Sequence, residues 1–324
     1  MKKLFVTGAA GFIGSHLTER LVELGYDVRA LVRYNSRNHW GWLEDSPRKN
    51  DVEVITGDLR DYDTVLKAMH DCQAVFHLAA LIGIPYSYVS PSAYLKTNIE
   101  GTYNVLHAAK ALGLENVIIT STSEVYGTAQ RVPIDETHPL VGQSPYSATK
   151  IAADQLAISY YLSFKLPVKI VRPFNTYGPR QSARAIIPTI ISQLLSGQKR
   201  VKLGNLSPTR DLTYVKDTVD GFVDIFKAEK LIGEITNIGM NEEISIGELA
   251  RKIMSLMNVD AELVTDRQRV RPEQSEVERL RCDNRKLMAN TPWRPKHDLR
   301  AGLIETIEWV RNHYTTYKPG IYNV

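Results

Sequence analysis

The sequence predicts an α/β fold, in which a doubly wound parallel sheet is combined with a smaller, mixed α/β domain. Along the first half of the chain, short apolar runs alternate with segments of helical periodicity. Strands that are apolar throughout and separated by helices are typical of a parallel sheet with helices on both faces. After residue 173 the pattern loosens, and prolines interrupt it at positions 179, 188, 208, 272, 292 and 295.

The expected elements follow one another in a regular order. We predict strands at residues 3–7, 27–32, 52–56, 74–78, 117–120 and 168–171. Helical spacing of apolar residues predicts helices at 12–24, 92–112, 146–166, 186–196, 246–257 and 299–313. We therefore assign residues 1–173 to the first domain, with a returning segment at 215–238, and residues 174–324 mainly to the second.

The composition is that of a soluble globular protein. Hydrophobic residues make up 43% of the 324 residues and charged residues 23%, which are ordinary values for such proteins. Cys72 and Cys282 are too few for a disulfide framework, and no apolar run reaches the roughly 18 residues of a membrane span. The net charge of +4, without interleaved aromatic residues, does not indicate nucleic-acid binding. We expect a cytoplasmic protein that binds no metal, membrane or nucleic acid.

A glycine motif joins the first strand to the first helix. Gly8, Gly11 and Gly14 have the spacing G-x-x-G-x-x-G, and Phe12 and Ile13 lie between the last two glycines. Glycines allow a tight turn and a close approach of the backbone to a pyrophosphate, and the helix N-terminus offers unpaired N–H groups. Between a strand and a helix, this motif predicts a dinucleotide-binding site of the Rossmann type.

The choice between NAD and NADP depends on the end of the second strand. An acid at that point binds the ribose 2′-hydroxyl of NAD. Here the strand continues into Arg33 and Arg37 with no acid, so NADP is slightly favoured because arginines neutralise a 2′-phosphate, and NAD remains open. Asp58, followed by Leu59, comes after the third strand. Its carboxylate either accepts a hydrogen bond from the adenine amino group or caps the next helix.

Two motifs carry candidate chemistry. Tyr146 and Lys150 are four residues apart, so on a helix they lie on one face. The lysine and a positively charged nicotinamide would lower the tyrosine pKa, so that the phenolate can take a hydroxyl proton. Thr122, Ser123 and Glu124 follow the fifth strand, at the sheet edge where ligands bind in such folds. Thr122 can bond the reacting oxygen, and Glu124 can remove a carbon-bound proton beside a ketone.

The motifs together give a family resemblance that covers nearly the whole chain. The sequence resembles the extended short-chain dehydrogenases/reductases, in particular the nucleotide-sugar epimerase/dehydratase group. The resemblance rests on the glycine motif, Tyr146 and Lys150, and on the segments 57–59, 77–80, 98–102, 121–127, 172–175 and 210–211. Residues 34–36, 40–43 and 204–211 are most similar to the N-acetylglucosamine-nucleotide 4,6-dehydratases of legionaminic-type synthesis.

The resemblance implies a reaction and a set of binding residues. Tyr146 would deprotonate O4 during oxidation at C4, Glu124 would remove H5, and water would leave from C6 before the hydride returns there. The substrate would be UDP- or GDP-N-acetylglucosamine, and relatives form homodimers through a four-helix bundle. Leu78, Ala79 and Ala80 would contact the cofactor, and the sugar nucleotide would be bound by Asn175, Arg180, Arg210 and Arg271.

One position departs from the dehydratase pattern. Many dehydratases have Asp where this chain has Ser123, and a serine is a poor general acid, so Glu124 would carry the proton from C5 to the C6 oxygen itself.

Three alternatives to dehydration stay open. UDP-glucuronate decarboxylases share the sequence of residues 121–127, which keeps decarboxylation open, and 4-epimerisation is a weaker alternative. A non-catalytic NAD(P)-binding regulator would not need Thr122, Glu124, Tyr146 and Lys150 together.

Overall fold

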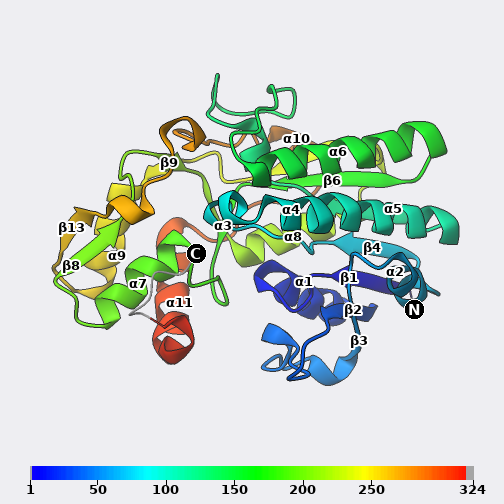
Figure 1. Cartoon of the computed structure of the whole chain (residues 1–324), viewed down its shortest axis with the longest axis horizontal. Helices are drawn as coiled ribbons and strands as arrows, with labels where there is room; N and C mark the ends of the chain where they lie inside the picture. The colour runs from blue at the N-terminus through cyan, green and yellow to red at the C-terminus, as the bar shows by residue number, and fades with distance from the viewer. Residues whose placement is uncertain (1, 319–324) are drawn as a thin grey trace.

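The computed structural model describes residues 2–318, and its centre is a parallel sheet of seven strands (Figure 1). The strand order is β11-β6-β5-β4-β1-β2-β3. The α/β fold with a doubly wound parallel sheet is therefore confirmed. The strands are β1 (Lys3–Thr7), β2 (Asp27–Arg33), β3 (Val52–Gly57), β4 (Ala74–His77), β5 (Asn116–Thr120), β6 (Val168–Pro173) and β11 (Ile235–Ile238).

Helices cover both faces of this sheet. Leu4 and Val6 of β1 belong to one core cluster, and Phe5 between them belongs to another, because neighbouring side chains of a strand point to opposite faces. The first cluster includes residues of α1 (Phe12–Glu23) and α8 (Val215–Lys227). The second includes residues of α2 (Tyr62–Met69), α5 (Gly101–Leu112) and α6 (Pro145–Phe164).

The helix expected at residues 92–112 is interrupted. It begins with α4 (Pro91–Tyr94), continues as the π-helical turn η3 (Leu95–Glu100) and ends with α5. The π-turn carries Asn98, whose side chain accepts from the Leu81 N–H at 2.8 Å and donates to the Leu81 carbonyl at 3.0 Å. π-Turns often occur at functional sites, and here the turn fixes the loop that follows β4.

The remaining elements form smaller units beside the sheet. Three two-stranded pairs lie there, β7 (Asn175–Tyr177) with β10 (Leu212–Tyr214), β8 (Arg200–Leu203) with β13 (Glu262–Thr265), and β9 (Thr209–Arg210) with β12 (Ile244–Ser245). The other helices are α3 (Ile84–Val89), α7 (Ile186–Leu195), α9 (Ile246–Met257), α10 (Arg285–Asn290) and α11 (Leu299–Asn312). Short 3-10 turns are η1 (Gly41–Leu43), η2 (Lys49–Asp51), η4 (Ser123–Tyr126), η5 (Glu229–Leu231), η6 (Arg267–Arg269), η7 (Glu273–Ser275) and η8 (Tyr314–Tyr317).

The chain returns to the main sheet after its first excursion. Helix α8 packs beside α1, and β11 pairs in parallel with β6, so residues 215–238 lie within the large layer. The division of the chain into domains at residue 173 stays a prediction. Between residues 2 and 318, no helix has the length and apolarity needed to cross a membrane.

Parallel strands place their carboxyl ends at one edge of the sheet. The segments that follow β1, β4, β5 and β6 therefore meet there, and the smaller units lie against the same side (Figure 1). In open α/β sheets, ligands bind at this edge. The edge holds the glycine motif, the segment after His77, the segment 121–127 and Asn175.

Candidate active site

The turn between β1 and α1 is built so that only glycine fits. Gly8 has a φ of +73°, and a Cβ atom on it would lie 2.7 Å from the Ala79 nitrogen. A Cβ atom on Gly14 would collide with the Gly8 carbonyl oxygen. Gly11 is exposed and begins α1 without a side-chain cap, so the N–H groups of Phe12 and Ile13 at the helix start remain available to an anion. This cradle fits the pyrophosphate of a dinucleotide.

The loop after β4 is tied to the glycine turn. The Thr7 hydroxyl accepts from the Ala79 N–H at 3.2 Å and lies 2.8 Å from Nδ1 of His77. Nε2 of His77 lies 3.1 Å from the Thr102 hydroxyl. Burial lowers the pKa of His77 to about 3, so the imidazole is neutral and orders the loop. The half-buried residues Leu78, Ala79 and Ala80 follow directly and form a wall beside the turn.

At the far end of the cofactor region, Arg33 and Arg37 are exposed. Asp58 forms an ion pair with Arg60, whose Nε lies 2.9 and 3.1 Å from the two carboxylate oxygens. These hydrogen bonds lower the pKa of Asp58 to about 2. The next helix is capped instead by Asp61, which accepts from the Asp63 N–H at 3.0 Å, so capping by Asp58 is excluded. Leu59 is buried against α5.

Helix α6 places Tyr146 and Lys150 side by side under the sheet edge. Its start is fixed by a capping box, in which the side chains of Ser144 and Ser147 each bond the other residue's backbone N–H. Tyr146 is 6% exposed and Lys150 is 3% exposed. The Lys150 ammonium donates to the Thr120 carbonyl oxygen at 2.6 Å, which ties the helix to the end of β5.

The segment after β5 meets this tyrosine. The Thr122 hydroxyl caps η4 by accepting from the Glu124 N–H at 3.2 Å, and a hydrogen bond with this side chain opposes the rise in the Tyr146 pKa that burial causes. The charge of Glu124 also acts on that pKa and raises it. Ser123 is buried in the same turn. Thr122 and Glu124 therefore both lie close enough to the Tyr146 phenol to act on its pKa.

One of the predicted anion contacts, Arg210, lies near Glu124. Burial lowers the pKa of Arg210, whereas the negative charges of Glu124 and Glu276 raise it. Arg210 lies 3.4 Å and Arg271 3.3 Å from the same oxygen of Glu276. Asn175, at the start of β7, has a buried side-chain oxygen that lacks a hydrogen-bond partner within the described residues.

Arg180 lies elsewhere. Its guanidinium donates to the Ser15 hydroxyl at 3.1 Å and to the Glu19 carboxylate at 2.8 Å, both on α1. Its predicted contact with the substrate stays a prediction, and this structure gives it a role in holding α1. Asp211 does not pair with Arg210, because its carboxylate accepts backbone N–H groups, among them that of Met240 at 2.7 Å.

Sequence reasoning missed a buried pair behind the site. Asp154 is fully buried and accepts from Nε and Nη2 of Arg172 at 3.1 and 2.9 Å. The available signal was the spacing, because Asp154 lies four residues beyond Lys150 and therefore one turn further on the same face. Glu276 was also missed, since nothing local in the sequence links it to Arg210.

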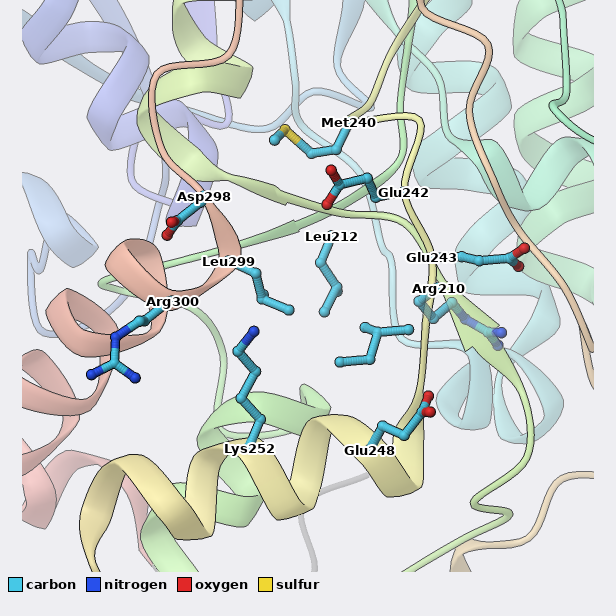
Figure 2. A pocket seen from close by; sticks show the side chains of 11 residues that line it. Arg210, Leu212, Met240, Glu242, Glu243, Glu248, Lys252, Asp298, Leu299 and Arg300 are labelled. Carbon is cyan, nitrogen blue, oxygen red and sulfur yellow. The ribbon is translucent and has the colours of Figure 1, made fainter.

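A separate cavity of about 520 Å³ lies between α9, α11 and the segment before β12 (Figure 2). Its centre has an apolar floor of Leu212 and Leu299, with Lys252 rising from α9. Arg210 lines its edge, but its guanidinium points away from the centre. Among the described residues, no group of three or more acidic, histidine or cysteine side chains is placed to hold a metal ion.

Comparisons with known proteins identify similar chains and agree with this fold. Residues 5–306 match the family model for GDP-mannose 4,6 dehydratase. The chain is 32% identical to the human dTDP-D-glucose 4,6-dehydratase, over 98% of this chain and 92% of the human protein. It is 33% identical to the UDP-N-acetyl-alpha-D-glucosaminuronate decarboxylase of Bacillus cytotoxicus, over 96% and 98% of the two chains. The UDP-glucuronic acid 4-epimerase of Bacillus cereus, solved with UDP-glucuronic acid and NAD, superposes with a TM-score of 0.87 at 29% identity, covering 96% of this chain and all of the other.

The glycine cradle generates the first prediction. Gly14→Ala places a methyl group against the Gly8 carbonyl, so the turn must open and the pyrophosphate contacts are lost. We expect cofactor affinity to fall by about tenfold or more, which corresponds to roughly 1.4 kcal/mol. Calorimetric titration with NAD and NADP measures this.

Gly247→Ala is the matched control, because a Cβ atom there meets its neighbours at an ordinary 3.5 Å. Unchanged cofactor affinity in the Gly14 variant would contradict the assignment of this turn as the cofactor cradle.

Proposed function

We propose that this chain, which belongs to the GDP-mannose 4,6-dehydratase family of extended short-chain dehydrogenases/reductases, is a nucleotide-sugar 4,6-dehydratase. The relatives are enzymes that act on nucleotide sugars, as dehydratases, epimerases and a decarboxylase. The observation that carries the proposal is that Thr122 and Glu124, in the turn after β5, both act on the buried phenol of Tyr146. A base for a hydroxyl proton and a base for a carbon-bound proton would then be able to act on one ring.

The chain's own residues account for the proton transfers. Tyr146 takes the O4 proton, and the Lys150 ammonium, fixed on Thr120, stabilises the resulting phenolate. The nicotinamide cofactor, when bound, accepts a hydride from C4 and returns it to C6. Once C4 is a ketone, Glu124 removes H5 and passes this proton to the C6 hydroxyl, which leaves as water. When C6 is reduced, C5 takes up a proton from solvent, and Tyr146 releases to solvent the proton that it took from O4, so that only water is lost overall. The product is a 4-keto-6-deoxy sugar, and the cofactor ends oxidised.

The proposed substrate is UDP- or GDP-N-acetylglucosamine. The similarity of residues 34–36, 40–43 and 204–211 to N-acetylglucosamine-nucleotide dehydratases supports this sugar. Arg210 and Arg271 lie close enough to share one carboxylate oxygen, so the same pair can share a diphosphate. The unpaired oxygen of Asn175 supplies a further polar contact at the sheet edge.

Decarboxylation is the second candidate function. Ser123 stands where many dehydratases have an aspartic acid, and the Bacillus cytotoxicus relative is a decarboxylase. A 4-epimerase would use Tyr146 and Lys150 without needing Glu124. A regulator that only binds NAD(P) would need none of these side chains placed at the ligand edge.

Incubation with a panel of sugar nucleotides tests the function, with mass spectrometry of the products. We expect loss of one water from UDP- or GDP-N-acetylglucosamine, without net consumption of cofactor. Loss of carbon dioxide from a glucuronate nucleotide would assign a decarboxylase, and inversion at C4 without a change of mass would assign an epimerase. Stoichiometric release of reduced cofactor would assign a simple dehydrogenase.

Glu124→Gln separates the two proton transfers. The amide cannot accept the C5 proton, so we expect elimination to slow by about 10²-fold or more, while transient reduction of the cofactor persists. Solvent deuterium exchange at C5 and stopped-flow absorbance measure the two steps.

Glu136→Gln is the control for Glu124, since Glu136 is a half-buried glutamate whose carboxylate accepts the Asn237 N–H. Elimination at nearly the wild-type rate in the Glu124 variant would show that another group is the base.

NADP is the slightly favoured cofactor in our proposal, because Arg33 and Arg37 are exposed at the end of β2. Replacing both with alanine should weaken NADP binding by about tenfold, or roughly 1.4 kcal/mol, and leave NAD binding unchanged. Parallel calorimetric titrations measure this difference. Equal effects on both cofactors would remove the support for NADP.

A homodimer is the proposed assembly. Tyr103 of α5 is 43% exposed, and Leu162 and Phe164 of α6 are 62% and 49% exposed. Apolar side chains grouped on neighbouring helices favour burial against a second copy. The cytoplasmic location stays a prediction.

A further inference from the structure

We propose that Asp154 is a positioning residue for the reaction, and that together with Arg172 it sets the local charge on which the Tyr146 and Lys150 pair depends. The contacts that support this proposal do not depend on the identity of the sugar. The kinetic arm of the test rests on the proposed function, and the spectroscopic arm does not.

The catalytic lysine and the buried acid hold adjacent residues of one strand end. Lys150 donates to the Thr120 carbonyl at 2.6 Å, and the next residue, Ser121, donates its hydroxyl to Asp154 at 2.8 Å. Asp154 lies one helical turn beyond Lys150 on α6, so the two side chains share a face of the helix. A single helix face therefore holds the end of β5 at two points.

Arg172 completes the arrangement from the neighbouring strand. The Ser121 N–H donates to the Val171 carbonyl at 2.7 Å, which brings the residue after Val171 beside the same strand end. Nε and Nη2 of Arg172 both donate to one oxygen of Asp154. Nη1 donates to the Tyr126 hydroxyl at 3.0 Å, so the guanidinium is held at both ends.

The burial of these charges makes their balance important. Asp154 is 0% exposed, Arg172 is 1% and Lys150 is 3%. Three hydrogen bonds fall on Oδ2 of Asp154, whereas Oδ1 is buried without a hydrogen-bond donor among the described residues. One anion and two cations leave one positive charge, which the phenolate of Tyr146 neutralises when it forms.

Removing the anion would leave two buried cations together. A guanidinium does not deprotonate in proteins, so the repulsion would instead lower the pKa of the Lys150 ammonium. Burial already lowers the pKa of Lys150, and the charge of Asp154 opposes that fall. Asp154 thus keeps Lys150 charged, and Lys150 in turn stabilises the Tyr146 phenolate.

Other charged groups face the pair from the surrounding elements. His77 on β4 is close enough for the charge of Lys150 to lower its pKa, and its burial keeps it neutral. Glu124 of η4 raises the pKa of Tyr146, as does Tyr94 of α4, whose ring centroid lies 6.2 Å from that of Tyr146. The two acids whose charges raise the pKa of Tyr146 are therefore Glu124 and Asp154, and of these Asp154 also raises the pKa of Lys150.

The test replaces Asp154 with Asn, which keeps the shape and removes the charge. Loss of a negative charge favours the deprotonated forms of both Tyr146 and Lys150. The acid limb of the pH profile, which reports Tyr146, and the basic limb, which reports Lys150, should therefore both move to lower pH, by about one unit. Arg172→Gln removes a positive charge and should move both limbs to higher pH. Ser121→Ala removes a hydrogen bond but no charge, and its profile should stay in place.

Two readouts are measured on the protein with bound cofactor. The first is the pH profile of cofactor reduction by the sugar nucleotide that the panel identifies. The second is an ultraviolet titration of tyrosinate, taken as the difference between each variant and the same variant carrying Tyr146→Phe, which needs no substrate. If no sugar nucleotide reacts, the proposed function fails, while the titration still decides the role of Asp154.

A merely structural role would lower thermal stability without moving either limb. Circular dichroism shows which of the variants Asp154→Asn and Arg172→Gln folds. If the limbs of the pH profile of a folded variant are not shifted, the proposal is overturned. If neither single variant folds, the double variant removes both charges and leaves none unpaired. Its limbs should lie near the wild-type positions, and a large displacement would also overturn the proposal.

Discussion

The hydrogen bond from the Lys150 ammonium to the Thr120 carbonyl is the contact on which the site depends. It joins the helix that carries the phenol to the strand whose end carries Thr122 and Glu124. A buried ammonium needs an acceptor, since an unpaired polar group in the interior costs more than the bond itself contributes. The same constraint fixes where α6 lies along β5, and therefore which residues face Tyr146.

How much of this was visible in the sequence depends on the range of each interaction. The parallel sheet, the glycine turn and the Tyr146–Lys150 pair are written in local patterns and short spacings. Six of the seven strands and the helices α1 and α6 were predicted to within a few residues, whereas β11, α2 and α8 were not predicted as separate elements. The π-turn around Asn98 was not predicted, because the Asn98 side chain is hydrogen-bonded to Leu81, seventeen residues earlier in the chain. The partner of Arg180 is Glu19, at a separation of 161 residues, and no periodicity reports such a pair.

Fold and family do not decide among the reactions of this scaffold, because dehydratases, epimerases and a decarboxylase all match this chain over nearly its whole length. The 122–124 turn separates only some of these reactions. A glutamate near the phenol is superfluous for oxidation at one carbon, as in 4-epimerisation, and becomes useful when a second proton must leave the adjacent carbon. Because UDP-glucuronate decarboxylases share residues 121–127, Glu124 argues against epimerisation and leaves elimination and decarboxylation as the two reactions that fit this turn.

The two arginines that contact Glu276 support the same proposal. The contacts of Glu276 to Arg210 and Arg271, at 3.4 and 3.3 Å, are longer than the roughly 2.7–2.9 Å of a strong charge-assisted bond. Arg210 instead binds the Val277 carbonyl at 2.7 Å, so its position does not depend on Glu276. The proposed diphosphate could therefore displace this carboxylate without moving Arg210. The charge of Glu124 also acts on Arg210, so the proposed anion contact and the proposed base lie near each other.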